Sequence, residues 1–178
     1  MRKILLLAGI LPIAAAGFAQ DKLSGRRAPG FSLPDMRLVQ YDLADYRGKF
    51  VLLDIMQTSC PHCKLFTKVL EEVKAAYGSR AAILSVVVPP DNQQRVAKYI
   101  EETKTSIPIL FDCGQMSASY LRVGPANQAI DLPHLFIIDG GGMIVRHYEY
   151  RDSPEIFEGK ALFADLEKLL PLKKTTGK

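Results

Sequence analysis

Hydrophobic positions along the chain follow two periods, and these predict strands that alternate with helices. Residues 50–56 are almost wholly apolar, as is typical of a central strand buried on both faces. Residues 60–77 place apolar side chains at a helical spacing, and a glycine follows them. A second apolar run covers 82–88, and a further helical pattern extends to about residue 104 with Asp91 as its expected N-cap.

The rest of the chain carries shorter runs of the same kinds. Together they predict an α/β fold: a mixed central sheet with helices on both faces and an N-terminal β-hairpin. Three glycines between two late apolar runs are a hairpin signal. We expect the remaining elements to be the N-terminal hairpin at 31–33 and 37–41, a helical turn at 43–46, a strand at 107–111, a helix at 116–121, strands at 135–139 and 143–150, and a helix from 154 to about 170.

The first residues have the pattern of a secretory signal peptide. Arg2 and Lys3 precede an uncharged apolar run that ends in small residues at Ala19. This run is shorter than the roughly 20 residues of a membrane span. We therefore expect cleavage after Ala19 and export of the protein, with the periplasm as its expected location. The alternative is an uncleaved N-terminal membrane anchor with the protein facing outside. The expected organisation is a signal peptide (1–19), a linker (20–29), one domain (30–172) and a basic tail (173–178).

Composition and charge narrow the classes of function. Of the 178 residues, 48% are hydrophobic and 24% are charged, which is typical of a globular protein and not of a disordered or coiled-coil one. A net charge of +4 without blocks of like charge gives no indication of nucleic-acid binding. Three cysteines are too few to staple a scaffold, so any cysteine chemistry must follow from their spacing.

Two of the cysteines form the motif Cys60-Pro61-His62-Cys63, where the buried strand ends and the helix begins. A helix N-terminus stabilises a thiolate through its free N–H groups and its dipole, which makes Cys60 the candidate nucleophile and Cys63 the resolving thiol. His62 can lower the pKa of Cys60 and favour the reduced pair, while Pro61 suits the first helical turn. The alternatives are a structural disulfide or half of a zinc site, although Cys113 has no second ligand beside it.

Two further residues are expected near the motif. Asp54 lies inside the apolar strand, where an unpaired carboxylate is costly. We expect it to accept a proton from Cys63 as a mixed disulfide resolves; a strand-end carboxylate that reaches water is the alternative. Pro133 precedes the strand at 135–138, where a cis proline would present backbone to a partner peptide. Cys113 is expected to be an idle thiol, and His147 an ordinary strand histidine.

With these features the chain resembles the thioredoxin superfamily, specifically its exported TlpA/ResA-like branch, which is related to the AhpC/TSA redoxin group. The resemblance runs from about Ala28 to Leu170 and implies a thioredoxin-like fold for the domain. It is carried by the segments APGFSL from Ala28, LADYRGKFVLL from Leu43, CPHC from Cys60, ILFD from Ile109 and LPHLFIID from Leu132.

The resemblance also implies an activity, that of a thiol–disulfide oxidoreductase without a metal and with no cofactor beyond the redox-active Cys60–Cys63 disulfide. Its substrates would be protein thiols or disulfides, such as apocytochrome c or another exported protein, and a membrane or exported redox partner would renew it. The Pro-His dipeptide is similar to that of the periplasmic oxidant DsbA, whose inserted helical domain is absent here, so the direction of electron flow stays open. The implied site residues are Cys60 as attacking thiol, Cys63 as resolving thiol, Asp54 as buried acid, His62 beside the thiolate, and Pro133, Leu132 and Pro61 as substrate contacts.

The chain departs from the family pattern in three places. Ser59 stands where a tryptophan usually precedes the first cysteine, Leu132 and His134 flank the proline where threonine is common, and the connection at 124–130 is longer than usual. These departures leave the chemistry in place and the substrate open. Two other functions also stay open, the first because the early Pro-Gly-Phe and Gly-Lys patterns are shared with peroxiredoxins. A thiol peroxidase of the peroxiredoxin type would need a threonine three residues before its cysteine, whereas Thr58 is two before Cys60. A Cu(I)-handling chaperone would need His134 beside the cysteines.

Overall fold

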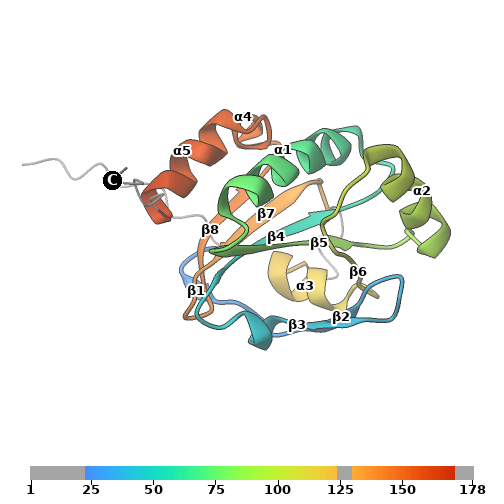
Figure 1. Ribbon diagram of the computed structural model, residues 1–178. Coiled ribbons are helices and arrows are strands. Elements are labelled where there is room, and N and C mark those ends of the chain that lie inside the picture. Colours follow the sequence, from blue (N-terminus) through green and yellow to red (C-terminus); the bar gives the residue numbers. More distant parts are fainter. Residues whose placement is uncertain (1–22, 124–129, 171–178) are drawn as a thin grey trace, which may run out of the picture.

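The computed structural model describes residues 23–123 and 130–170, which form a six-stranded sheet and a separate two-stranded hairpin (Figure 1). The strand order in the sheet is β1-β8-β7-β4-β5-β6. Strands β4, β5 and β6 are parallel, whereas β7, β8 and β1 each run antiparallel to their neighbour, so the sheet is mixed as predicted. The strands of the sheet are β1 (Arg26–Arg27), β4 (Phe50–Met56), β5 (Ala81–Val87), β6 (Ile109–Phe111), β7 (His134–Ile138) and β8 (Met143–Glu149).

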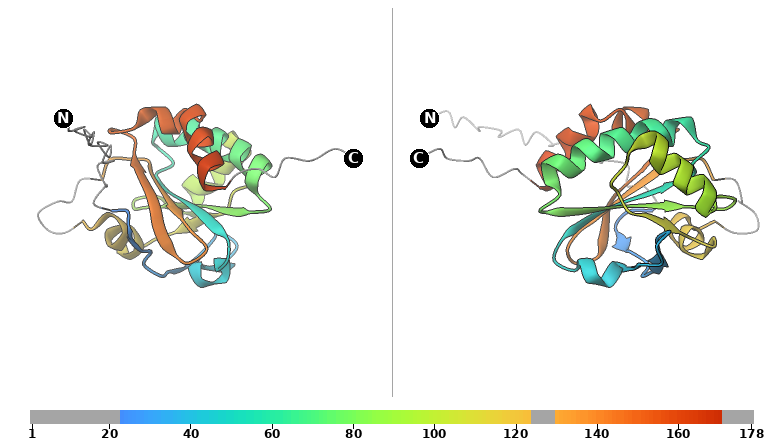
Figure 2. Two further views of the ribbon diagram at one scale, coloured as in Figure 1. Left: turned by 90° about the vertical axis from the view of Figure 1, so that its left-hand side faces the viewer. Right: turned by 45° about the vertical axis from the view of Figure 1, so that its right-hand side comes forward.

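Helices cover both faces of this sheet, which confirms the predicted architecture. In Figure 2, α1, α2, α4 and α5 lie on one side, and α3 lies on the other side together with the hairpin. Alternate residues of β4 supply the two cores, because successive side chains of a strand point to opposite faces: Leu52 packs with α1 and α5, and Leu53 with α3 and the hairpin. The helices and the hairpin are α1 (Pro61–Tyr77), α2 (Gln93–Thr103), α3 (Gln115–Leu121), α4 (Pro154–Phe157), α5 (Lys160–Leu169), the 3-10 helix η1 (Leu43–Tyr46), β2 (Ser32–Pro34) and β3 (Gln40–Asp42).

Part of the segment expected to be a linker, residues 20–29, belongs to the domain. Arg26 and Arg27 form β1 and pair with Ile144 and Met143 of β8, and Ala28 is buried in the core. The polar composition of the segment concealed this strand, because an edge strand needs only backbone groups to pair. The expected signal peptide (1–19) and basic tail (173–178) lie outside the described residues.

The C-terminal helix is also divided where one helix was expected. Gly159 separates α4 from α5 with a φ of 101°, a backbone conformation that suits glycine. A Cβ at this position would meet Val69 Cγ1 of α1 at 3.1 Å. The close approach of the two segments therefore requires both the break and the glycine.

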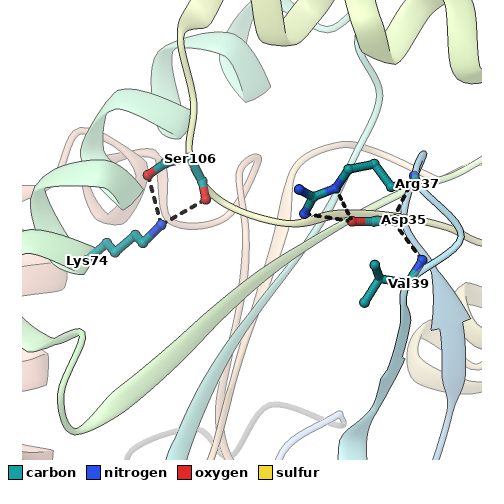
Figure 3. A network of polar contacts seen from close by, with 5 residues as sticks. All are labelled: Asp35, Arg37, Val39, Lys74 and Ser106. Carbon is teal, nitrogen blue, oxygen red and sulfur yellow. Dashed lines mark hydrogen bonds and ion pairs between the residues drawn. The ribbon is translucent and has the colours of Figure 1, made fainter.

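The N-terminal hairpin turns through residues 35–39, a longer loop than the connection expected between the segments 31–33 and 37–41. The buried Asp35 carboxylate accepts hydrogen bonds from the backbone N–H groups of Arg37 (2.8 Å) and Val39 (3.0 Å) (Figure 3). Burial opposes the charge of Asp35, but these hydrogen bonds outweigh burial and lower its pKa. Figure 3 also shows Lys74 of α1 donating to the carbonyl and hydroxyl of Ser106, which ties α1 to the approach of β6.

Among residues 23–123 and 130–170, no helix has both the length and the apolar character needed to cross a membrane.

Candidate active site

The Cys-x-x-Cys motif lies at the junction between β4 and α1, as the sequence predicted. Cys60 is the N-cap of α1, and its Sγ accepts a hydrogen bond from the backbone N–H of Cys63 at 3.2 Å. Pro61 occupies the first helical turn, where a missing N–H costs nothing, and its side chain is exposed. Cys60 is partly exposed and Cys63 is fully buried, and both are free thiols. The outer sulfur alone is open to a partner.

The two thiols have opposite acidities. Hydrogen bonds from the Cys63 side chain and from the backbone N–H groups of Cys63 and His62, together with the charge of His62, lower the pKa of Cys60 to about 6. Burial and the hydrogen bond given to Cys60 raise the pKa of Cys63, and the nearby charge of Asp54 adds to this. Near neutral pH, therefore, Cys60 is a thiolate while Cys63 keeps its proton.

Asp54 lies beneath the cysteines on the α1 side of the sheet, because it alternates with Leu52 and Met56 along β4. Its side chain is fully buried. Oδ2 accepts a hydrogen bond from Ser85 Oγ of β5 at 3.0 Å, while Oδ1 accepts none within the described part of the chain. Burial raises the pKa of Asp54 to about 7. The carboxyl group can therefore take or give a proton near neutral pH.

Pro133 and Leu132 bring the start of β7 to the thiol. The Leu132–Pro133 peptide bond is cis, as hypothesised from the sequence. The carbonyl oxygen of Leu132 lies 3.7 Å from Cys60 Sγ. Leu132 is thus adjacent to the motif, in agreement with the expectation that Pro133 lies near the cysteines.

His62 is exposed, and its imidazole stacks on the ring of Tyr150 at the end of β8. The ring centroids are 4.0 Å apart and the planes are inclined by 23°. The backbone N–H of Tyr150 donates to Pro133 O at 3.2 Å, so Tyr150 connects His62 to the cis-proline loop. Sequence reasoning missed Tyr150, because nothing but its place at the end of an alternating run marked it.

Thr58 and Asp91 fix the loop that leads to Cys60. The backbone N–H and the hydroxyl of Thr58 each donate to an oxygen of Asp91 at 2.6 Å. The prediction that Asp91 caps α2 is wrong: Asn92 is the N-cap and accepts from Arg95 N–H, because both Asp91 oxygens are engaged by Thr58. The Thr58 hydroxyl is thus engaged by Asp91.

The two strand histidines lie together, away from the cysteines. His134 alternates with Leu135, which packs with α1, so its side chain lies on the α3 face of the sheet. His134 Nδ1 and His147 Nε2 are 3.0 Å apart, and His147 also stacks on Phe136. This placement counts against the copper hypothesis, which needed His134 at the thiols. The described residues contain no cluster of three or more metal-ligating side chains.

Two other residues from the sequence hypotheses stand apart from this cluster of contacts. Ser59, in the position of the usual tryptophan, is exposed beside Cys60. Cys113 is a free, exposed thiol between β6 and α3. Residues 124–129 of the long connection lie outside the described residues.

Comparisons with known proteins agree with this geometry. A model of the AhpC/TSA family matches residues 24–147. The chain is 29% identical over 144 residues to the thiol-disulfide oxidoreductase ResA of Geobacillus thermodenitrificans, covering 79% of each protein. It is 26% identical over 160 residues to ResA of Bacillus thuringiensis, covering 88% of this chain and 89% of that one. The solution structure of a thiol:disulfide interchange protein from Bacteroides sp. superposes with a TM-score of 0.68 at 22% identity, covering 85% of this chain and 93% of that one.

Asp54 makes the stability of the reduced protein depend on pH. The pKa of Asp54 is raised in the folded state to about 7, from about 4 in the unfolded chain. The contribution of Asp54 to stability is therefore fully present below about pH 4 and is lost as the pH rises through about 7. We expect the free energy of unfolding to fall by roughly 2 to 3 kcal/mol more between about pH 5 and about pH 8 in the wild type than in Asp54→Asn. Urea unfolding at the two pH values measures this, with the exposed Asp45→Asn as control. Parallel pH dependences in wild type and Asp54→Asn would contradict the assignment.

Proposed function

This chain belongs to the AhpC/TSA family and is a thiol–disulfide oxidoreductase, and from that premise we propose that it exchanges a Cys60–Cys63 disulfide or dithiol with protein thiols through a mixed disulfide at Cys60. One observation carries the proposal: a partly exposed Cys60 at a helix N-terminus, with Cys63 buried behind it and hydrogen-bonded to it. That arrangement gives one sulfur to the partner and keeps the other for resolution.

The steps follow from the two acidities. In the oxidising direction a partner thiolate attacks Cys60 Sγ, the bond between Cys60 and Cys63 breaks, and Cys63 leaves as a thiolate that takes up a proton. A second partner thiolate then attacks the partner sulfur of the mixed disulfide and releases the stabilised Cys60 thiolate. In the reducing direction the same steps run backwards, and Cys63 must lose its proton before it attacks Cys60. Two electrons pass in either case, and the reaction uses no cofactor beyond the pair of sulfurs.

Asp54 supplies the proton transfer at Cys63. Its position on the α1 side of β4 and its pKa of about 7 suit it to accept the Cys63 proton near neutral pH and to return it in the other direction. The hydrogen bond from Ser85 fixes Oδ2, so Oδ1 is left for the proton.

The partner is an exported protein in this proposal. The exposed Pro61 follows Cys60 in the chain, and the carbonyl oxygen of Leu132 lies 3.7 Å from Cys60 Sγ, with Pro133 next to Leu132. These three residues would contact the segment that carries the partner sulfur. The cations and apolar run of residues 1–19 support export to the periplasm. Apocytochrome c is one exported thiol protein that fits this chemistry, and a membrane or exported redox partner would restore the active state.

Substituting each cysteine tests the assignment of roles. Cys60→Ser removes the attacking sulfur, so we expect disulfide exchange with a dithiol peptide to fall by at least about a hundredfold. Cys63→Ser cannot resolve, so it should accumulate a mixed disulfide at Cys60 that mass spectrometry detects. Cys113→Ser, which removes the remaining thiol, should match the wild-type rate. Full exchange by Cys60→Ser would refute the proposal.

The redox potential tests the direction of electron flow. The pKa of Cys60, about 6, lies between the pKa of the reactive cysteine in thioredoxin, about 7, and that in DsbA, about 3.5. We therefore expect a potential between the corresponding values of about −270 mV and about −120 mV. Equilibration with glutathione buffers measures it. A value at or below about −270 mV would show that stabilisation of Cys60 does not set the potential of the pair.

A further inference from the structure

An aromatic row extends from the protein core to the redox motif. Phe66 of α1 meets Phe157 of α4 edge to face, with centroids 4.7 Å apart, and Phe157 meets Tyr150 in the same manner at 5.7 Å. The outermost member is His62, stacked on Tyr150 at 4.0 Å. Phe66 and Phe157 are buried, so the row is anchored at its inner end.

Tyr150 is held from a second direction by the cis-proline loop. Its N–H donates to the carbonyl oxygen of Pro133, and the next residue, Arg151, forms an ion pair with Asp131. The same loop places Leu132 O at 3.7 Å from Cys60 Sγ. Tyr150 therefore links both components of the site, the start of α1 and the start of β7.

An exposed imidazole is normally free to turn between rotamers, which lie at different distances from Cys60. Stacking on a restrained ring selects one of these rotamers. A positive charge retained near Cys60 favours the thiolate and thereby the reduced pair.

We propose that Tyr150 is a positioning residue: by stacking on His62 it keeps the imidazole beside Cys60 and makes the Cys60–Cys63 disulfide a stronger oxidant. The inference rests on the proposed function and extends it to a residue that does not touch the reacting sulfurs. Among the described residues, the Cys63 side chain acts on the pKa of Cys60, the charge of Asp54 acts on the pKa of Cys63, and the Tyr99 hydroxyl donates to the carbonyl oxygen of Cys63 at 3.3 Å. The variants used as tests leave these three residues in place.

The first experiment measures the pH dependence of iodoacetamide alkylation at Cys60 and the equilibrium of the disulfide with glutathione. In Tyr150→Leu we expect the alkylation midpoint to rise by about half a unit to one unit, and the glutathione equilibrium to shift by about three- to tenfold toward the protein disulfide. Tyr150→Phe keeps the ring and should stay within about twofold of the wild type. Tyr41→Leu, on the hairpin at the other face of the sheet, is the control and should change neither value.

A double-mutant cycle distinguishes positioning from a structural effect. In a His62→Gln background, Tyr150→Leu should cause no further shift, because the group that Tyr150 positions is gone. An equal shift in both backgrounds, or no shift in Tyr150→Leu, would overturn the proposal. Alkylation needs no exchange partner, so this result is independent of whether Cys60 exchanges with protein thiols.

A second measurement leaves Tyr150 unchanged, so it holds even if Tyr150→Leu fails to fold. The ring current of Tyr150 should shift the imidazole proton resonances of His62 upfield of those of a solvated histidine in the reduced wild-type protein. Resonances at the solvated position would show that the two rings do not stack, and would overturn the proposal on their own.

Discussion

The hydrogen bond from the backbone N–H of Cys63 to Cys60 Sγ is the interaction on which the site depends. β4 ends at Met56, and α1 begins at Pro61 after a short loop. Cys60 is the last residue of that loop and is therefore the N-cap of the helix. Side chains that usually cap a helix are oxygen acceptors. A cysteine in this position accepts the hydrogen bond best as a thiolate. The geometry of the helix start therefore lowers the pKa of Cys60.

The sheet gives the two sulfurs different surroundings. Cys60 is partly exposed at the N-terminus of α1, whereas Cys63, one turn further along the helix, lies over β4 and its buried Asp54. Burial raises the pKa of Cys63 and that of Asp54 alike, so both groups favour their protonated forms. A single packing arrangement thus gives the two sulfurs different acidities and buries the Asp54 carboxyl group near Cys63.

The local pattern of apolar residues was sufficient to predict the central strands and helices and the position of the Cys-x-x-Cys motif. The run Phe50–Met56, apolar except at Asp54, predicted β4 to the residue, because a strand buried on both faces is apolar at nearly every position. Contacts between distant segments were not predictable: Tyr150 reaches His62, and Asp91 takes Thr58 instead of capping α2, only through the tertiary fold. Likewise, β1 forms because its backbone pairs with β8, and the helix breaks at Gly159 because this segment packs closely against α1. Hydrophobic periodicity in the sequence predicts neither feature.

Alkylation of the reduced wild-type protein tests the central claim, that the helix start makes Cys60 and not Cys63 the thiolate. Iodoacetamide would be applied over a range from about pH 4 to about pH 9, and mass spectrometry would assign the label to each cysteine. The structure predicts that Cys60 is labelled with a midpoint at about pH 6 while Cys63 stays unlabelled. A midpoint at the ordinary cysteine value of about 8.5, or label at Cys63 before Cys60, would contradict it.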